Sequence, residues 1–230
     1  MEAVILAAGR GTRLKPFTDQ TPKPLLEVQG RPILDWILQA LPPSVERVVV
    51  VVNYLADQIE AYLARQTHMR HYSTVRQEVA RGTGDAFRSC FPHLRGDKYL
   101  VMNADDLFAP ADLDILCQHE AGLLVHPVDR PEQFGIAFRR PEGTLEKLIE
   151  KPSITGTQLA NVGVYLFPRE VQQLELQLSP RGEYEITDYV SQLAARRAVQ
   201  VVSARFWLPI GTVEAWENSR KADLRPALRQ

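Results

Sequence analysis

The residues best suited to chemistry lie near the start of the chain, where two glycines and two cations surround a short loop. Val4-Ile5-Leu6 is an apolar run, and Gly9 and Gly11 follow it in a small-residue turn. Glycine lets a backbone approach a phosphate closely, because it has no Cβ and accepts positive φ. Arg13 and Lys23 add a planar fork of donors and a mobile point charge. This order predicts a phosphate-handling loop at the carboxyl end of a buried first strand.

The spacing of the two glycines excludes two common phosphate-binding motifs. Gly9 and Gly11 do not form GxGxxG, and no GK[ST] is present in the chain. The alternative to a phosphate-handling loop is a tight turn between a strand and a helix, which would use the same two glycines.

A second glycine-rich turn occurs at residues 77–86, QEVARGTGDA, between a short strand and a helix. On composition alone it is equally a simple helix entry, with Thr83 or Asp85 as the capping residue. The residue types alone leave both interpretations open.

An acidic pair follows a predicted buried strand in the middle of the chain. Residues 98–103, KYLVMN, form that strand, and Asp105 and Asp106 come directly after it. Acidic residues at the carboxyl end of a parallel strand lie where open α/β sheets bind ligands. The alternative is that one of them only caps the following turn.

An alternation of helical and strand patterns must position these groups. Apolar residues repeat at helical spacing over 33–41, and Pro42-Pro43 ends that pattern. Residues 45–53, VERVVVVVN, suit a parallel strand that is covered on both faces. Residues 55–65 return to the helical period. This order predicts an α/β fold with a doubly wound, mostly parallel sheet.

The pattern changes after a further strand at 121–128. Residues 134–138 and 144–150 are strands joined by the turn RPEG, which is hairpin spacing rather than βαβ spacing. We also predict a strand over 159–167 and a closing helix over 213–225.

Composition limits the classes of partner. The chain has 230 residues, 45% hydrophobic and 24% charged, with a net charge of −1. This balance gives no indication of nucleic acid or an anionic membrane as a partner. Cys90 and Cys117 form no CxxC or Cys/His cluster, which favours a reduced pair. No signal peptide or membrane span is apparent, so we expect a cytoplasmic location.

The whole string from Leu6 to Leu34, LAAGRGTRLKPFTDQTPKPLLEVQGRPIL, resembles the N-terminal motif of the sugar-1-phosphate nucleotidyltransferases, or NDP-sugar pyrophosphorylases. These include glucose-1-phosphate thymidylyl- and uridylyltransferases and muramate-1-phosphate uridylyltransferase. In that family the loop wraps a nucleoside triphosphate, and a Gln ahead of a GTG-type turn reads the base. The resemblance therefore assigns nucleotide binding to Leu6, Ala7, Ala8, Gly9, Gly11, Thr12, Gln77, Gly82 and Thr83.

The resemblance also implies catalytic and metal-binding roles. Arg13 would hold the leaving pyrophosphate, and Lys23 would hold the α-phosphate region in the transition state. Asp105 matches the family's Mg²⁺ ligand. A carboxylate oxygen on a hard cation that also bridges substrate phosphates is the usual arrangement for Mg²⁺.

Three later motifs resemble the family's sugar-binding residues. An aromatic-Gly pair, an EKP and an NxG occur in the family's order. The resemblance implies that Gly135, Glu150 and Asn161 bind sugar hydroxyls and that Lys151 binds the phosphate. Without the resemblance, Glu150 would be a solvated strand-end charge and Asn161 a turn residue. Phe134 stands where the family more often has Tyr, so that hydroxyl contact is absent.

The chain departs from the family at one metal-binding position. The family usually has W-x-D-[IV]-G-T, whose Asp is a second metal ligand, and this chain has Pro209 in that place. Proline has no side-chain oxygen for coordination. Either the ion keeps an extra water, or Asp106 or another carboxylate takes over, or the chemistry is weakened. The segment 182–188, GEYEITD, also resembles the family, and we assign it mainly a structural role that shapes the sugar pocket.

The activity that the resemblance implies is Mg²⁺-dependent transfer of a nucleotidyl group from a nucleoside triphosphate to a sugar 1-phosphate. UTP or dTTP is favoured by Gln77. The implied fold is one Rossmann-like domain over 1–230, with a nucleotide-binding portion over about 1–128 and a sugar-binding portion over about 129–230. The alternatives are a non-catalytic nucleotide-sugar-sensing or scaffold subunit and a CTP-dependent phosphocholine cytidylyltransferase. Relatives are often dimers or tetramers, which leaves a homo-oligomer open.

Overall fold

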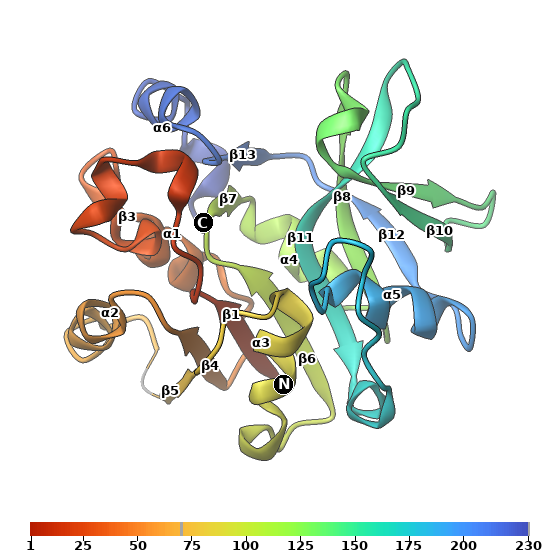
Figure 1. Cartoon of the computed structure of the whole chain (residues 1–230), viewed down its shortest axis with the longest axis horizontal. Coiled ribbons are helices and arrows are strands. Elements are labelled where there is room, and N and C mark those ends of the chain that lie inside the picture. Colours follow the sequence, from red (N-terminus) through yellow and green to blue (C-terminus); the bar gives the residue numbers. More distant parts are fainter. Residues whose placement is uncertain (70, 230) are drawn as a thin grey trace.

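The computed structural model describes residues 1–69 and 71–229, and these form a mixed α/β fold around one large sheet (Figure 1). The strands of that sheet are β1 (Glu2–Leu6), β4 (Arg47–Val52), β5 (Tyr72–Arg76), β6 (Lys98–Asn103), β8 (Gly122–Val128), β9 (Gly135–Arg139), β10 (Leu145–Glu150), β11 (Gln158–Pro168) and β12 (Gln200–Ser203). Their order is β10-β9-β11-β6-β1-β4-β5, and β8 pairs with β11 and β12 beside this path.

The N-terminal half of the sheet is parallel. β1 lies between β4 and β6, and β5 lies outside β4, all in parallel register. Side chains of these strands alternate between two apolar cores, so that Val48 and Val50 pack on one face and Val49 and Val51 on the other. β-Branched residues suit a strand that is buried on both faces. The predicted parallel, doubly wound sheet is therefore confirmed.

The C-terminal half of the sheet is largely antiparallel. β11 runs antiparallel to β6, β8 and β9, and β9 and β10 form the predicted hairpin. β12 lies parallel to β8. Because β11 pairs directly with β6, the hairpin portion is joined to the parallel portion by one continuous sheet.

Helices cover both faces of the sheet. They are α1 (Ile33–Ala40), α2 (Ala56–Leu63), α3 (Thr83–Ser89), α4 (Pro110–Leu116), α5 (Ile186–Ala194) and α6 (Val213–Ser219). Apolar residues of α3 and α5 belong to one core, and those of α1, α2, α4 and α6 belong to the other. Two small antiparallel sheets pair β2 (Glu27–Val28) with β3 (Arg31–Pro32), and β7 (Asp106–Phe108) with β13 (Trp207–Pro209).

The last helix returns to the N-terminal portion, as Figure 1 shows for α6 beside β3. Trp216 donates its indole N–H to the carbonyl of Glu27 at 2.9 Å. The predicted helix over 213–225 is too long, because α6 ends at Ser219. Gln29 donates to the carbonyl of Ser219, the last residue of the helix, and to that of Ala222, which lies past its end.

Within residues 1–69 and 71–229, no helix has the length and apolar character needed to cross a bilayer. Cys90 and Cys117 are both free thiols, as predicted.

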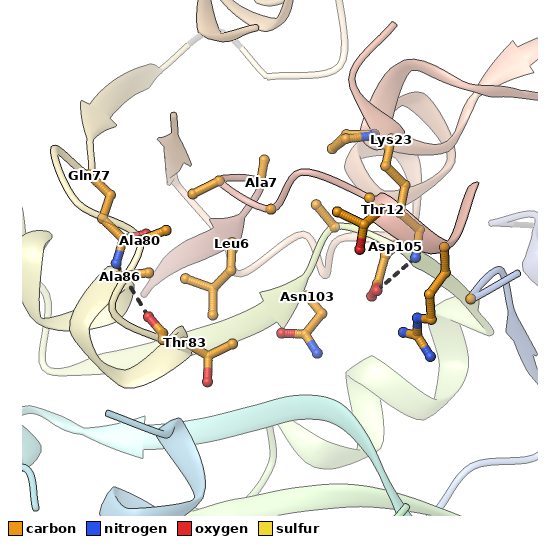
Figure 2. A pocket seen from close by; sticks show the side chains of 18 of the residues that line it. Leu6, Ala7, Thr12, Lys23, Gln77, Ala80, Thr83, Ala86, Asn103 and Asp105 are labelled. Carbon is orange, nitrogen blue, oxygen red and sulfur yellow. Dashed lines mark hydrogen bonds and ion pairs between the residues drawn. The ribbon is translucent and has the colours of Figure 1, made fainter. Parts of the chain in front are cut away.

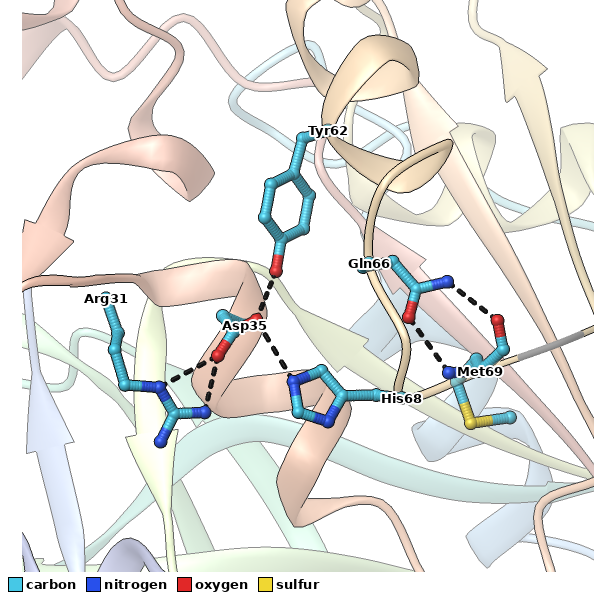
Figure 3. A network of polar contacts seen from close by, with 6 residues as sticks. All are labelled: Arg31, Asp35, Tyr62, Gln66, His68 and Met69. Carbon is cyan, nitrogen blue, oxygen red and sulfur yellow. Dashed lines mark hydrogen bonds and ion pairs between the residues drawn. The ribbon is translucent and has the colours of Figure 1, made fainter.

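Asp35 of α1 is a partly buried carboxylate that contacts side chains from three neighbouring segments (Figure 3). Arg31 donates through Nε at 2.8 Å, and the Tyr62 hydroxyl of α2 donates at 2.5 Å. The His68 ring contacts Oδ1, the same oxygen that accepts from Tyr62, with Nε2 at 3.0 Å, whereas Arg31 contacts Oδ2. Burial by itself would raise the pKa of Asp35, but the hydrogen bonds from Tyr62 and Arg31 outweigh it and hold that pKa below its ordinary value.

Because the pKa of Asp35 is lowered on folding, this carboxylate contributes stability above its unfolded pKa of about 3.9, and that contribution is lost as pH falls through the folded pKa. We expect Asp35→Asn to lower the free energy of unfolding by about 1–3 kcal/mol at pH 7. Urea titrations should show the two proteins converging below about pH 4. A difference in stability that stays constant down to pH 3 would contradict this prediction.

Candidate active site

A cavity of about 370 Å³ opens at the carboxyl ends of β1 and β6. All the residues predicted to bind nucleotide line it, namely Leu6, Ala7, Ala8, Gly9, Gly11, Thr12, Gln77, Gly82 and Thr83. Arg13, Lys23 and Asp105 line it as well. Gln77 lies at one end of this first cavity in Figure 2, and Lys23 with Asp105 at the other.

The opening loop is folded tightly onto the segment that carries Lys23. Gly11 has φ +61°, and a Cβ there would lie 3.0 Å from Thr18 Cγ2 and 3.1 Å from Lys23 Cβ. The Thr18 hydroxyl donates to the Gly11 carbonyl at 2.9 Å. Gly11 is therefore required by both its backbone conformation and this close approach. Gly9 has open space at its Cβ position, so it leaves room toward the cavity.

The Lys23 ammonium donates to Asp105 Oδ2 at 2.9 Å, and this ion pair joins the opening loop to the end of β6 (Figure 2). Only 7% of the Lys23 surface is exposed, so its charge depends on this partner. Arg13 lies nearby, because a Cβ on Gly211 would be 3.8 Å from the two terminal nitrogens of its guanidinium. This end of the cavity thus has two cations and one carboxylate.

Gln77 is buried at the other end of the first cavity. Its amide nitrogen donates to the Gly82 carbonyl at 3.3 Å and to Asp85 Oδ2 at 3.1 Å. These contacts fix the orientation of the amide and occupy its donors, which leaves the oxygen as an acceptor. The predicted caps are wrong, because no side chain caps α3. Asp85 is held by Gln77 and Arg88 instead.

A second cavity of about 260 Å³ adjoins the first, and Arg13, Thr83 and Asp105 line both. Gly135, Glu150 and Asn161, which were predicted to bind sugar, line the second cavity.

The hairpin places Gly135 directly opposite Glu150. A Cβ at Gly135 would lie 2.9 Å from Glu150 Oε2, so the glycine makes room for that carboxylate. Asn161 is held by its own strand, since its Nδ2 donates to the Tyr165 hydroxyl at 2.8 Å and its Oδ1 accepts from the Gly163 N–H at 3.2 Å.

Lys151 stands apart from the other predicted residues. It is exposed, has φ +45° and is not among the residues that line the two cavities. Its backbone N–H donates to the Phe134 carbonyl at 2.9 Å, which fixes the turn after β10.

Sequence reasoning missed Arg181 and Glu185, which both line the second cavity. The Arg181 guanidinium contacts Glu150 at 3.2 Å and Glu185 at 3.0 Å. Glu185 belongs to the segment 182–188, GEYEITD, for which the sequence predicts mainly a structural role, and Arg181 directly precedes that segment.

Asp106 is tied to β13 and to the loop after it. Its Oδ2 accepts from the Trp207 indole N–H at 2.8 Å and its Oδ1 accepts from the Ile210 N–H at 3.0 Å. Burial, aided by the charge of Asp105, raises the pKa of Asp106 above its ordinary value. Each oxygen carries one hydrogen bond and keeps a second lone pair, so the alternative in which Asp106 replaces the missing metal ligand stays a prediction.

The donor set fits a divalent cation that is shared with a substrate. Pro209 pairs with Asp106 in the β7–β13 ladder and brings no side-chain oxygen. Across residues 1–69 and 71–229, no three His, Cys, Asp or Glu side chains gather in a metal-binding group. Asp105 remains as one carboxylate beside Lys23 in the first cavity. Mg²⁺ is commonly held by one or two carboxylates together with substrate phosphates and water.

Comparisons with known proteins agree with this geometry. The Nucleotidyl transferase family matches residues 2–225. The bifunctional protein GlmU of Methanocaldococcus jannaschii is 30% identical over 214 residues, which cover 92% of this chain and 51% of GlmU. The UTP–glucose-1-phosphate uridylyltransferase AglF of Haloferax volcanii is 31% identical over 226 residues, 93% of each chain.

A crystal structure of a UDP-glucose pyrophosphorylase complexed with UDP-glucose has a TM-score of 0.85 at 21% identity, over 96% of this chain and 97% of that one, which shows the shared fold. This chain spans about half the length of the GlmU relatives that it matches. The family resemblance of the N-terminal string is confirmed, and the chain belongs to the Nucleotidyl transferase family.

Proposed function

We propose that this protein transfers a nucleotidyl group from a nucleoside triphosphate to a sugar 1-phosphate, and so forms an NDP-sugar and pyrophosphate. The observation that carries the proposal is the pair of adjoining cavities, which share Arg13 and Asp105 at their junction. A nucleotide in the first cavity and a sugar phosphate in the second would meet at that junction. AglF, a relative named as a uridylyltransferase, supports the same reaction class.

The chemistry needs positioning and charge neutralisation rather than a general base. The phosphate of a sugar 1-phosphate is already an anion at neutral pH, and it would attack the α-phosphorus directly. Arg13 would hold the leaving pyrophosphate, and Lys23 would exchange Asp105 for the α-phosphate. Fixed cations of this kind stabilise charge that develops in the transition state. Asp105 would hold Mg²⁺, which supplies further charge neutralisation when bound.

The first cavity favours a base with an imide N–H. Gln77 has its nitrogen committed to Gly82 and Asp85, and its oxygen remains to accept. Uracil and thymine present an N3–H at that edge, whereas cytosine presents an acceptor there. UTP or dTTP is therefore the proposed donor.

The second cavity supplies groups for both parts of a sugar phosphate. Glu150, Asn161 and the backbone of Gly135 would accept or donate to hydroxyls. Arg181 lines this cavity and would contact the phosphate of the sugar 1-phosphate. Lys151, which follows Glu150 in the chain, is a second candidate for that contact.

One observation favours phosphocholine as a second candidate acceptor. Phe134, Tyr165 and Trp207 line the second cavity together with Glu150 and Glu185. The Phe134 and Trp207 rings meet edge-on, with centroids 5.6 Å apart. Aromatic faces beside carboxylates are suited to a quaternary ammonium group.

A matrix assay of pyrophosphate release with Mg²⁺ tests the proposal. UTP, dTTP, CTP, GTP and ATP would each be paired with hexose, N-acetylhexosamine and N-acetylmuramic acid 1-phosphates and with phosphocholine. We expect turnover with UTP or dTTP and a sugar 1-phosphate. Turnover with CTP and phosphocholine alone would establish the second candidate. Nucleotide binding in a thermal-shift assay without any turnover would favour the sensing or scaffold subunit.

Lys23→Met should remove a charge that contacts the reacting phosphate. We expect kcat to fall by about 10²–10³-fold, the usual cost of losing one such contact. Lys15→Met is the matched control, because Lys15 is exposed and forms a surface ion pair with Asp19 four residues later. A Lys23→Met enzyme with near-wild-type kcat would exclude this role.

Asp105→Asn should abolish metal-dependent turnover, because the amide keeps the shape of the carboxylate but loses its charge. We expect kcat to fall by at least about 10²-fold at every Mg²⁺ concentration, with an unchanged circular dichroism spectrum. Asp19→Asn, at an exposed ion pair, should behave like the wild type. If Asp105→Asn recovers full activity at high Mg²⁺, Asp105 is not the essential metal ligand.

A further inference from the structure

Residues 181–185, RGEYE, which we call the bridging segment, contribute to both cavities. Glu183 lines the first cavity, and Arg181 and Glu185 line the second. The position of this one short segment therefore affects both ligand sites.

Three hydrogen bonds fasten the bridging segment to the start of α3. The Tyr184 N–H donates to the Arg81 carbonyl at 2.8 Å, and the Gly84 N–H donates to the Tyr184 carbonyl at 2.8 Å. The Ile186 N–H, just after the segment, donates to Thr83 Oγ1 at 3.1 Å. We call these three hydrogen bonds the clasp.

The clasp brings two backbones together with no side chain between them. A Cβ on Gly84 would lie 2.8 Å from the backbone C and O of Glu185 and 2.9 Å from Leu176 Cδ2. A Cβ on Gly82 would lie 2.4 Å from the Tyr184 carbonyl oxygen. Gly82 also lines the first cavity, but Gly84 is not among the lining residues of either cavity. A substitution at Gly84 therefore changes the packing of the clasp without changing a residue that lines a cavity.

The bridging segment is exposed at its start and held locally at its end. Arg181, Gly182 and Glu183 are exposed, and Gly182 has φ +77° in a turn closed by its N–H to the Ser179 carbonyl. The Ser179 N–H donates to the Glu183 carbonyl at 2.9 Å, and Tyr184 forms a β-bridge with Leu178 and packs against one core. The clasp and the ion pairs of Arg181 with Glu150 and Glu185 tie this local turn to α3 and β10.

The other side of the clasp is a wall of the first cavity. Residues 78–81 are exposed, and Ala80 and Gly82 line that cavity. Gln77 also donates to the Gly82 carbonyl. A nucleotide in the first cavity would contact this loop and reduce its freedom. A ligand that orders a shared element lowers the entropic cost of the second ligand.

We propose that Gly84 is a positioning residue. Its missing side chain lets the bridging segment close on α3, so that a nucleotide in the first cavity orders Arg181 and Glu185 in the second. This inference rests on the proposed function, because it takes the first cavity as the nucleotide site.

Hydrogen exchange of the wild-type protein with UTP as the probe tests the proposal directly. We expect UTP to slow amide exchange about tenfold both in residues 7–13 and in residues 181–186, within the usual range of coupling between sites. Slowed exchange in 7–13 with no change in 181–186 would overturn the inference and leave the proposed function standing. If neither UTP nor dTTP slows exchange in either segment, both the proposed function and the inference are wrong.

Gly84→Ala should uncouple the bridging segment from the first cavity. We expect the UTP-dependent protection of 181–186 to be lost, and, because coupling is reciprocal, the Kd for UTP from titration calorimetry to rise by about tenfold. Ser89→Ala, in the last turn of α3, is the matched control and should keep that protection. A purely structural role would lower the Tm of Gly84→Ala and leave the protection by UTP intact, which would contradict the proposal.

Discussion

The arrangement of the site depends on the parallel pairing of β1 with β6. Leu6 and Asn103 are partners at the carboxyl ends of these strands, and the Ala104 N–H donates to the Leu6 carbonyl just beyond them. The chain leaves the two strands at the same edge of the sheet, as open α/β sheets require of their ligand sites. The small-residue loop and Asp105, which are far apart in the sequence, are thereby placed together, and Lys23 joins them.

The charged groups of the site are paired with one another before any ligand arrives. Lys23 pairs with Asp105, and Arg181 pairs with Glu150 and Glu185. The carboxylates hold these cations at fixed positions beside the two cavities. A phosphate bound as proposed above would replace one counter-ion by another, without an excess of positive charge in the site.

The two halves of the sheet come from different parts of the sequence and are joined by direct contacts. β11 connects them through its pairing with β6, and the bridging segment connects them through the clasp on α3. Asp106 adds a third link, since its carboxylate accepts hydrogen bonds from Trp207 and Ile210 of the C-terminal half. Strand pairing, the clasp and this carboxylate therefore tie together the elements that line the two cavities.

The sequence by itself determined the parallel sheet, the hairpin and the lining of the first cavity. The valine run at 48–52 and the string from Leu6 to Leu34 carry local signals, namely burial on both faces and the small residues that a phosphate loop requires. Only the tertiary structure decided which charges meet. Arg181 looks like an ordinary loop cation until the fold places it against Glu150, and Asp106 shows its hydrogen bonds to Trp207 and Ile210 only in the folded chain. These contacts join residues that are far apart in the sequence, so the types and spacing of neighbouring residues do not show them, whereas the local hydrophobic pattern does show the strands.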